Sequence, residues 1–372
     1  MINYRICSRY YYPGELTNKM SEQNLEEIIR FMSSAKQPGA VYGMKGSLGS
    51  YLLASAVKRG APTIVKIELD SDSAAVSARD IRFFLGLNET SESTIDTRIC
   101  HYPSTLTQPY SFAAFESEVW INRAAALYSL ADGIKPRALT ISLDSLLRRM
   151  VPRKSFGSTL LNLRVGQELE REYILEALTD AGFRRGPLVE DVGDFSVRGY
   201  IIDLFSPLYF NPIRIEQSGD TVESIRFFDP VSQRSKDSVQ EIIISPVHTF
   251  IIQESTVEKG LERFVAACEH HGVEKRVRQG LMDDLRLRTR FPGAENYLSY
   301  FFETLEPLTS YFPPDATLIL PDTESMSRVL EETWEEIEQG YKNALESGLP
   351  APHPHDLYLS ADELMQQLNR FR

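Results

Sequence analysis

The stretch Gly43-Met44-Lys45-Gly46-Ser47-Leu48-Gly49-Ser50 has the outline of a phosphate-binding loop, and the interpretation of the whole chain starts from it. Such a loop reads G-x-x-x-x-G-K-[ST]: backbone N–H groups surround the phosphates, the lysine reaches the outer phosphates and the hydroxyl holds Mg²⁺. Aligned on Gly43 and Ser50, this chain has Leu48 in place of the second glycine and Gly49 in place of the lysine. We therefore expect a nucleotide-binding fold that has lost its nucleotide chemistry.

The residues on both sides of the loop suit such a site, because the run 40–42 predicts a strand and the run 51–57 predicts a helix. Glycine and serine between a strand and a helix are also ordinary turn residues of any α/β domain, and this alternative stays open. Lys45 lies near the loop, but it is four residues before the position of a phosphate-binding lysine and does not replace it.

Length and composition predict a folded protein of two or three domains. The chain has 372 residues, of which 42% are hydrophobic and 25% charged, and one core rarely serves so long a chain. No apolar run approaches the roughly 20 residues of a membrane helix, and the first residues lack a secretion signal, so we expect a cytoplasmic protein without membrane contact. Cys7, Cys100 and Cys268 lie far apart in the sequence, which predicts buried thiols and neither a disulfide framework nor a metal site.

The charge balance disfavours DNA as the main partner. Forty basic and 52 acidic side chains give a net charge of −12, whereas DNA binding relies on clustered positive charge. The best candidate for a DNA contact is the basic stretch from Lys275 to Arg290. Asp283 and Asp284 interrupt that stretch, so a solvated helix face of mixed charge is the favoured interpretation.

Patterning along the chain divides it into three parts. Residues 1–157 alternate a helix at 22–35 with strands at 63–69 and 138–142, which predicts a parallel sheet. Residues 158–248 predict an inserted α+β domain of mainly antiparallel strands, since one helix at 167–181 precedes closely spaced strands. Those strands are expected at 199–205, 212–216, 222–228 and 241–244, and the third of the chain from 249 to 372 is expected to be mostly helical and to complete the first domain.

Two sequence patterns refine this division. On the strand 212–216, Ile213 and Ile215 alternate with Arg214 and Glu216, which places the charged pair on the face opposite the apolar pair. In the remainder, helices are expected at 257–269, 274–288 and 324–346. The last of these helices repeats apolar residues every three or four positions. This pattern is typical of a helix packed on its own domain, and the alternative is a helix that docks on a partner.

A strand at 316–322 ends at Asp322 and resembles the metal-holding strand of a P-loop motor. In an active motor a glutamate normally follows and orients the attacking water, but Thr323 stands there in this chain. Both halves of a nucleotide site are therefore present in outline and lack the residues that carry chemistry. The fold class that we expect is a degenerate P-loop, helicase-like α/β domain interrupted by the inserted domain.

Three ordered segments give a specific resemblance: Phe195 to Phe205 (FSVRGYIIDLF), Ile213 to Glu216 (IRIE) and Val222 to Arg234 (VESIRFFDPVSQR). They resemble the second domain shared by UvrB and the bacterial transcription-repair coupling factor family (Mfd). The likeness is close over the inserted domain and looser over its flanks. It implies that residues 1–157 correspond to the first part of the UvrB helicase-like domain, 158–248 to the UvrA-binding domain and 249–372 to the helical remainder.

Two departures favour the coupling factors over UvrB. UvrB resembles an active helicase with an intact phosphate loop, and it carries a tyrosine-rich hairpin that inserts into damaged DNA. This chain lacks the loop lysine, and its region from His101 to Trp120 is too short for that hairpin. The resemblance thus implies the amino-terminal UvrB-homology module of a coupling factor, as a fragment without the polymerase-binding and translocase regions.

In that family the inserted domain binds UvrA through mainly polar contacts. Carried over by motif position, the expected contact residues are Arg185, Arg198, Arg214 and Glu216. An arginine that is common in UvrB two residues before Arg198 is Ser196 here, and Arg184 could compensate for it. Exposed arginines on a rigid sheet suit such an interface because they form forked, charge-assisted bonds with carboxylates; the alternative is that they are ordinary solvent-facing charges.

The resemblance implies a non-catalytic adaptor that recruits UvrA and links RNA polymerase stalled at DNA damage to nucleotide excision repair. ATP and Mg²⁺ are expected only in the motor region of the full-length protein, an ATP-dependent DNA translocase, where another domain covers the UvrA surface until the motor engages. The main alternative is a helicase or UvrB-like repair subunit that still binds nucleotide or DNA. Its site would be the degenerate loop, with Gly43, Gly46, Gly49, Ser50 and Asp322.

Overall fold

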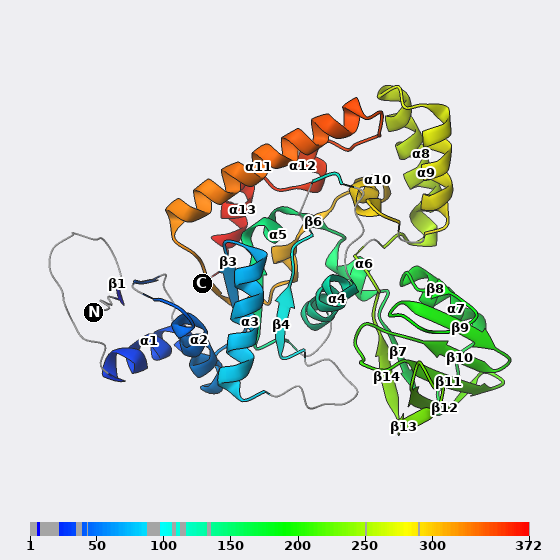
Figure 1. The fold of residues 1–372 in the computed structure, drawn as a ribbon, viewed down its shortest axis with the longest axis horizontal. Coiled ribbons are helices and arrows are strands. Elements are labelled where there is room, and N and C mark those ends of the chain that lie inside the picture. Colours follow the sequence, from blue (N-terminus) through cyan, green and yellow to red (C-terminus); the bar gives the residue numbers. More distant parts are fainter. Residues whose placement is uncertain are drawn as a thin grey trace.

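The computed structural model describes residues 6–7, 22–34, 39–42, 44–87, 97–105, 109–111, 117–131, 135–249, 251–288 and 291–371. These residues form a parallel-sheet layer, an antiparallel unit that extends to one side of it, and a set of helices that lies across both (Figure 1). The chain is thus a mixed α/β protein, as the sequence predicts. Gly43 and Arg290, and much of the stretch between His101 and Trp120, lie outside the described residues.

The parallel sheet has four strands in the order β16 (Thr317–Ile319), β3 (Ile64–Glu68), β5 (Ala138–Ser142) and β4 (Ile99–Tyr102), and all neighbours run parallel. The strands predicted at 63–69 and 138–142 are confirmed. The strand predicted at 316–322 is shorter than expected and lies at the edge of the sheet formed by the described strands, where it pairs with β3.

Both faces of the parallel sheet are covered, which explains why its strands are apolar almost throughout. Ile64, Ile99 and Ala138 pack on one face in a cluster with residues of α1 (Glu22–Ser34), α2 (Leu48–Lys58) and α3 (Ser71–Leu85). Their chain neighbours Val65, Cys100 and Leu139 point to the other face, where they join the largest core of the protein. That core includes α4 (Ser117–Ala131), α5 (Leu143–Leu147) and α6 (Arg153–Gly157).

Helix α3 shows how local sequence sets an element's limits. Asp70 caps its first turn, because its carboxylate accepts a hydrogen bond from the Ser73 amide at 2.8 Å. The helix ends at Gly86, whose φ of 69° lies in the left-handed region.

The antiparallel unit comprises residues 161–244 and begins and ends in a two-stranded ribbon of β7 (Leu161–Arg164) and β14 (Glu241–Ile244). Its six-stranded sheet has the order β13-β12-β11-β10-β9-β8, antiparallel except between β8 and β9. Helix α7 (Arg171–Asp180) packs on the inner face of the sheet with Ile174 and Leu178. The strands are β8 (Arg184–Arg185), β9 (Asp194–Arg198), β10 (Ile201–Leu204), β11 (Ile213–Ser218), β12 (Thr221–Phe228) and β13 (Ser235–Val239).

Two predictions for this unit need correction. The strand predicted at 241–244 exists, but it pairs with β7 instead of continuing the meander. The helix predicted at 167–181 begins only at Arg171, because Glu168 forms an isolated antiparallel bridge with Thr221. The predicted meander itself is confirmed from β10 to β12, and it continues in β9 and β13, which the sequence did not predict as strands.

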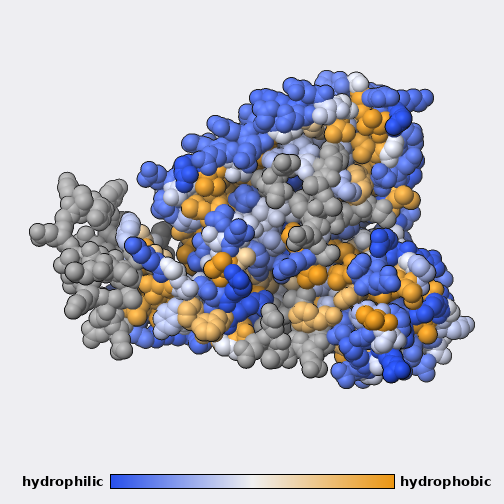
Figure 2. All heavy atoms as spheres, in the orientation of Figure 1, coloured by the Kyte–Doolittle hydropathy of each residue, from blue (hydrophilic) through white to orange (hydrophobic). Residues whose placement is uncertain are grey.

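The helical remainder covers the largest core. Helices α8 (Glu254–His270) and α9 (Lys275–Arg286) pack against each other, and α11 (Thr323–Glu346) buries Met326, Leu330 and Ile337. The exposed side of α11 forms a hydrophilic edge of the molecule (Figure 2), so this helix packs on its own domain. The other elements are β1 (Ile6–Cys7), β2 (Ala40–Val41), β6 (Arg149–Met150), η1 (Ala294–Tyr297), α10 (Leu298–Phe301), β15 (Glu306–Pro307), η2 (Leu308–Tyr311), α12 (Pro354–Leu357) and α13 (Ala361–Leu368).

Two further expectations concern cysteines and membranes. Cys100 and Cys268 are buried free thiols, as predicted, and burial raises the pKa of Cys268 to about 11. Within the described part of the chain, no helix is both long and apolar enough to cross a membrane.

Candidate functional site: the arginine face of the antiparallel unit

The outer face of the antiparallel sheet carries an ordered row of charges, here called the arginine face: Arg198, Asp203, Arg214, Glu216 and Arg226. The alternation of side chains along each strand puts these residues on one side of the sheet and the apolar residues of β11 on the other. The predicted separation of Arg214 and Glu216 from Ile213 and Ile215 is therefore confirmed.

Asp203 on β10 is the centre of this row. The register places it between Ser196 on β9 and Arg214 on β11. Arg214 donates two hydrogen bonds to its carboxylate, from Nε to Oδ1 at 2.7 Å and from Nη2 to Oδ2 at 2.9 Å. Arg198 adds a third bond, from Nη2 to Oδ2 at 2.6 Å. Asp203 is 1% exposed, so its charge is compensated entirely within the protein.

The two arginines that share Asp203 differ in their exposure. The side chain of Arg198 is 48% exposed, whereas that of Arg214 is only 14% exposed. The guanidinium of Arg214 also lies 4.7 Å from the centre of the Phe228 ring, and its hydrogen bonds to Asp203 raise its pKa above the ordinary value. The expectation that Arg214 is a solvent-facing arginine is therefore wrong, because the neighbouring strand supplies a buried carboxylate that draws it inward.

Glu216 and Arg226 continue the row on β11 and β12. Glu216 accepts hydrogen bonds from Ser224 Oγ at 2.7 Å and from Arg226 Nη2 at 3.0 Å. The side chain of Arg226 is 38% exposed and lies directly opposite Arg214 in the strand register. Sequence reasoning missed Arg226 and Asp203, although the alternation along 222–228 and the hairpin after Arg198 contain the signal for both.

Arg184 and Arg185 lie at the other edge of the sheet, on the two-residue strand β8 that pairs with β9. The side chain of Arg184 is 75% exposed and bonds to Asp194 Oδ1 through Nε at 3.1 Å and Nη2 at 2.8 Å. Ser196 is buried, and its hydroxyl donates to the carbonyl of Pro187 at 3.0 Å. The side chain at position 196 therefore offers nothing to a partner, while Arg184 and Arg185 stay accessible.

The described residues around the predicted loop have the expected secondary structure, since β2 lies before residues 44–47 and α2 begins at Leu48. Gly46 has a φ of +56°, and Ser50 is buried in the first turn of α2. A Cβ atom on Gly49 would lie 3.7 Å from Nζ of Lys66 on β3. That ammonium is already neutralised, because it lies 2.6 Å from Glu68 Oε1 and 2.8 Å from Ser77 Oγ. Among the described strands, β2 pairs with β1 and lies outside the four-stranded parallel sheet.

Asp322 lies three residues beyond the end of β16 and caps helix α11. Its carboxylate accepts a hydrogen bond from the Ser325 amide at 2.9 Å, and this bond lowers the pKa of Asp322. The cap explains this acidic residue without any metal, and the role predicted for it in a degenerate nucleotide site stays a prediction.

The described part of the basic stretch lies on α9 up to Arg286 and continues to Arg288, and its cations are partly paired. Arg278 Nη1 lies 3.0 Å from Glu269, and Arg286 Nε lies 3.7 Å from Glu258, both on α8. This pairing is the mixed-charge helix face that the sequence favoured.

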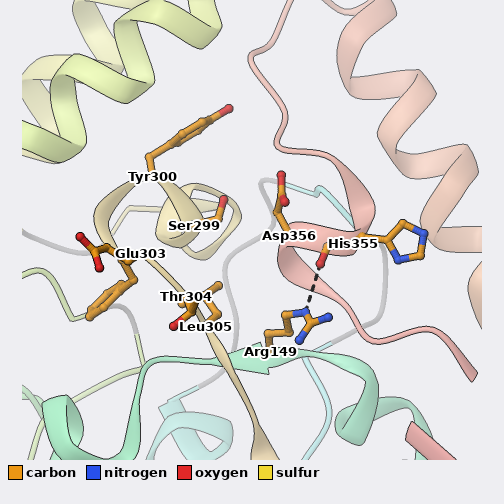
Figure 3. Close-up of a pocket in the computed structure, with 9 residues that line it drawn as sticks. Arg149, Ser299, Tyr300, Glu303, Thr304, Leu305, His355 and Asp356 are labelled. Atoms are coloured by element: carbon orange, nitrogen blue, oxygen red, sulfur yellow. Dashed lines mark hydrogen bonds between the residues drawn. The ribbon is translucent and has the colours of Figure 1, made fainter. Parts of the chain in front are cut away.

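A polar cavity of about 330 Å³ lies elsewhere, between β6, α10 and α12 (Figure 3). Arg149 lines it and donates from Nε to the carbonyl of His355 at 3.1 Å. The imidazole of His355 points away from the cavity toward Trp334, whose ring centre lies 4.9 Å away. In the described ranges, no three histidine, cysteine or carboxylate side chains are grouped so that they could hold a metal ion.

Comparison with known proteins places these features in a family. A family model described as the UvrB interaction domain matches residues 161–250. A transcription-repair-coupling factor of Myxococcus xanthus is 30% identical over 337 residues, which is 89% of this chain and 28% of that protein. The corresponding factor of Staphylococcus aureus (strain USA300) is 28% identical over 256 residues, 66% of this chain and 22% of that protein.

The chain thus spans between a fifth and a third of the length of these relatives. Its similarity to them nevertheless extends well beyond the antiparallel unit, over most of the parallel sheet and the helical remainder. The chain is therefore a UvrB-homology module related to the transcription-repair-coupling factors, and its residues 161–250 match the UvrB interaction domain.

Proposed function

We propose that this module is a non-catalytic adaptor that binds UvrA through the UvrB interaction domain. Within a coupling factor it would link RNA polymerase stalled at DNA damage to nucleotide excision repair in the cytoplasm. The observation that carries the proposal is the arginine face, where three guanidinium groups meet only two carboxylates on a rigid sheet inside the matched domain. An excess of accessible cation on an acidic chain favours a partner with an acidic surface.

The loop and Asp322 support the non-catalytic part of the proposal. Position 49 carries no lysine, the nearby ammonium of Lys66 is neutralised by Glu68, and Asp322 is engaged as a helix cap. Phosphoryl transfer needs cations and metal ligands placed around the outer phosphates. ATP and Mg²⁺ would thus act only in the motor region of the full-length protein, where another domain would cover the arginine face until the motor engages.

Titration of the purified module with UvrA is the direct test. We expect the wild-type module to bind and the combined Arg198→Ala and Arg226→Ala substitutions to weaken binding by at least about tenfold. Arg164→Ala is the matched control, because Arg164 is an exposed, ion-paired arginine of the same domain on β7. A wild-type module that does not bind UvrA, or a double variant that binds as tightly as the wild type, would overturn this surface.

An assay of ATP hydrolysis tests the alternative that the module binds nucleotide. Measurable ATP hydrolysis by the module that Ser50→Ala abolishes would favour a helicase-like subunit over an adaptor. We expect no hydrolysis above the level of a buffer control.

A further inference from the structure

The three arginines of the arginine face differ in the donors that they can still offer. Arg214 uses Nε and Nη2 on Asp203, and its Nη1 lies 3.5 Å from the carbonyl of Gln233. One face of its guanidinium is also covered by Phe228. Arg198, in contrast, bonds to the described part of the chain through Nη2, which leaves Nε and Nη1 for another acceptor.

We propose that Asp203 and Arg214 are positioning residues that hold Arg198 in place, and that Arg198 and Arg226 make the contact with acidic side chains of the partner. This inference rests on the proposed binding of UvrA and divides the arginine face into a buried clamp and two exposed contact residues. It moves the contact away from Arg214, which motif position alone had assigned to the interface.

Burial explains why Asp203 can act as a clamp. A buried carboxylate is costly unless it is neutralised and hydrogen-bonded, and Asp203 receives three bonds from two guanidinium groups. The two hydrogen bonds of Arg214 to Asp203 fix its guanidinium group against the carboxylate. Oδ2 of Asp203 can therefore accept a further hydrogen bond from Arg198. Tethering Arg198 at one nitrogen reduces the rotamer entropy that it must lose when it binds a partner.

Arg226 completes the contact surface for an electrostatic reason. It lies directly opposite Arg214 on the neighbouring strand, and like charges in that position destabilise a sheet. Glu216 relieves part of this repulsion through one bond at 3.0 Å to Arg226 Nη2. A carboxylate from a partner would relieve the rest, and the 48% and 38% exposure of Arg198 and Arg226 leaves both within its reach.

A double-mutant cycle on UvrA binding tests the clamp. Arg198→Ala and Asp203→Asn should each weaken binding by about tenfold, and the double variant should bind no more weakly than Arg198→Ala alone. The two effects would then not add, because Asp203 acts only through Arg198. Arg226→Ala should weaken binding about fivefold and should add to Arg198→Ala, since the two side chains bind separate acceptors.

Salt dependence separates contact residues from positioning residues. Arg198→Ala and Arg226→Ala should flatten the dependence of Kd on salt concentration, whereas Arg214→Lys should leave that slope as in the wild type. Arg214→Lys keeps the positive charge beside Asp203, so it still tests the clamp if the Asp203→Asn variant does not fold. Circular dichroism and Tm show whether each variant is folded.

The outcomes distinguish this inference from the proposed function. No binding by the wild-type module overturns both. Binding by the wild type, with additive effects of Arg198→Ala and Asp203→Asn or with a flattened salt slope for Arg214→Lys, overturns the clamp and leaves the adaptor role intact.

Discussion

Arg288 and Asp180 are 108 residues apart in the sequence and form an ion pair that joins the helical hairpin α8–α9 to helix α7 of the antiparallel unit. Both side chains are largely enclosed, and Glu254 lies 3.9 Å from the second terminal nitrogen of Arg288. Burial raises the pKa of Asp180, although the charge of Arg288 opposes this shift. The antiparallel unit is therefore attached by a side-chain contact in addition to its two chain connections.

Removal of this contact should loosen the antiparallel unit. Arg288→Ala leaves Asp180 partly buried without its cation, and we expect a loss of about 1–2 kcal/mol, seen as a lower Tm in calorimetry. Limited proteolysis should then cut faster near residues 158–160 and 245–249. Arg286→Ala is the control, because its pair with Glu258 is exposed and 3.7 Å long; an equal effect of both variants would contradict the role of Arg288.

Stability should depend on pH through Glu363, the residue that closes the capping box of α13. Burial alone would raise its pKa, but the Ser360 amide and the charge of Arg149 together lower it below the ordinary value of 4.5. A lowered folded-state pKa stabilises the fold above the ordinary value, and this contribution disappears as pH falls through the folded-state value.

The variant Glu363→Gln isolates this contribution, since glutamine can still accept the cap hydrogen bond. Urea unfolding should show the wild type more stable by less than about 1 kcal/mol at pH 7, because the pair with Arg149 is partly exposed. The difference should shrink below pH 4.5. A difference that grows on acidification would have the wrong sign for this mechanism.

Asp322 should behave as a helix cap. Asp322→Asn retains an oxygen for the Ser325 amide and should leave Tm nearly unchanged, whereas Asp322→Ala removes the acceptor and should lower Tm. Nucleotide binding, followed by equilibrium dialysis with ATP and Mg²⁺, should be absent from all three proteins. Mg²⁺-dependent ATP binding that Asp322→Asn abolishes would instead assign this residue to a metal site.

Helix α9 should contribute little to DNA binding. Its cations are partly paired with α8, and the chain carries a net charge of −12. Fluorescence anisotropy with a duplex at low salt should show weak binding that changes by less than about twofold in the Lys275→Glu, Arg276→Glu double variant. Tight binding with a steep salt dependence, lost in that variant, would make α9 a DNA contact.

Much of this fold follows from sequence because its signals are local. The β-branched run 63–69 and the alternation of Ile213, Arg214, Ile215 and Glu216 are each set by a few neighbouring residues, and both are found as predicted. The pairing of β7 with β14 is different, because it joins segments separated by the whole antiparallel unit. No local pattern specifies which distant strand supplies the partner.

The environment of Arg214 shows the same limit at the scale of one side chain. Alternation gives the face on which Arg214 lies, but not the acceptors that share this face. Asp203 reaches it because β10 and β11 pair in a register that places Asp203 opposite Arg214, and the connection 205–212 joins these two strands. The hairpin at Gly199 and Tyr200 places Asp203 on the same face as Arg198, but the register between β10 and β11 depends on a longer connection that no local pattern specifies.

The ribbon of β7 and β14 has a consequence for how this module can change over time. Leu161 and Ile244 are paired partners, so the antiparallel unit enters and leaves its host at one place. A segment with adjacent ends can be transplanted between hosts, or exchanged for a homologous segment, without a gap in the recipient backbone. The ribbon thus makes the antiparallel unit an exchangeable cassette, which can change while the parallel-sheet scaffold stays the same.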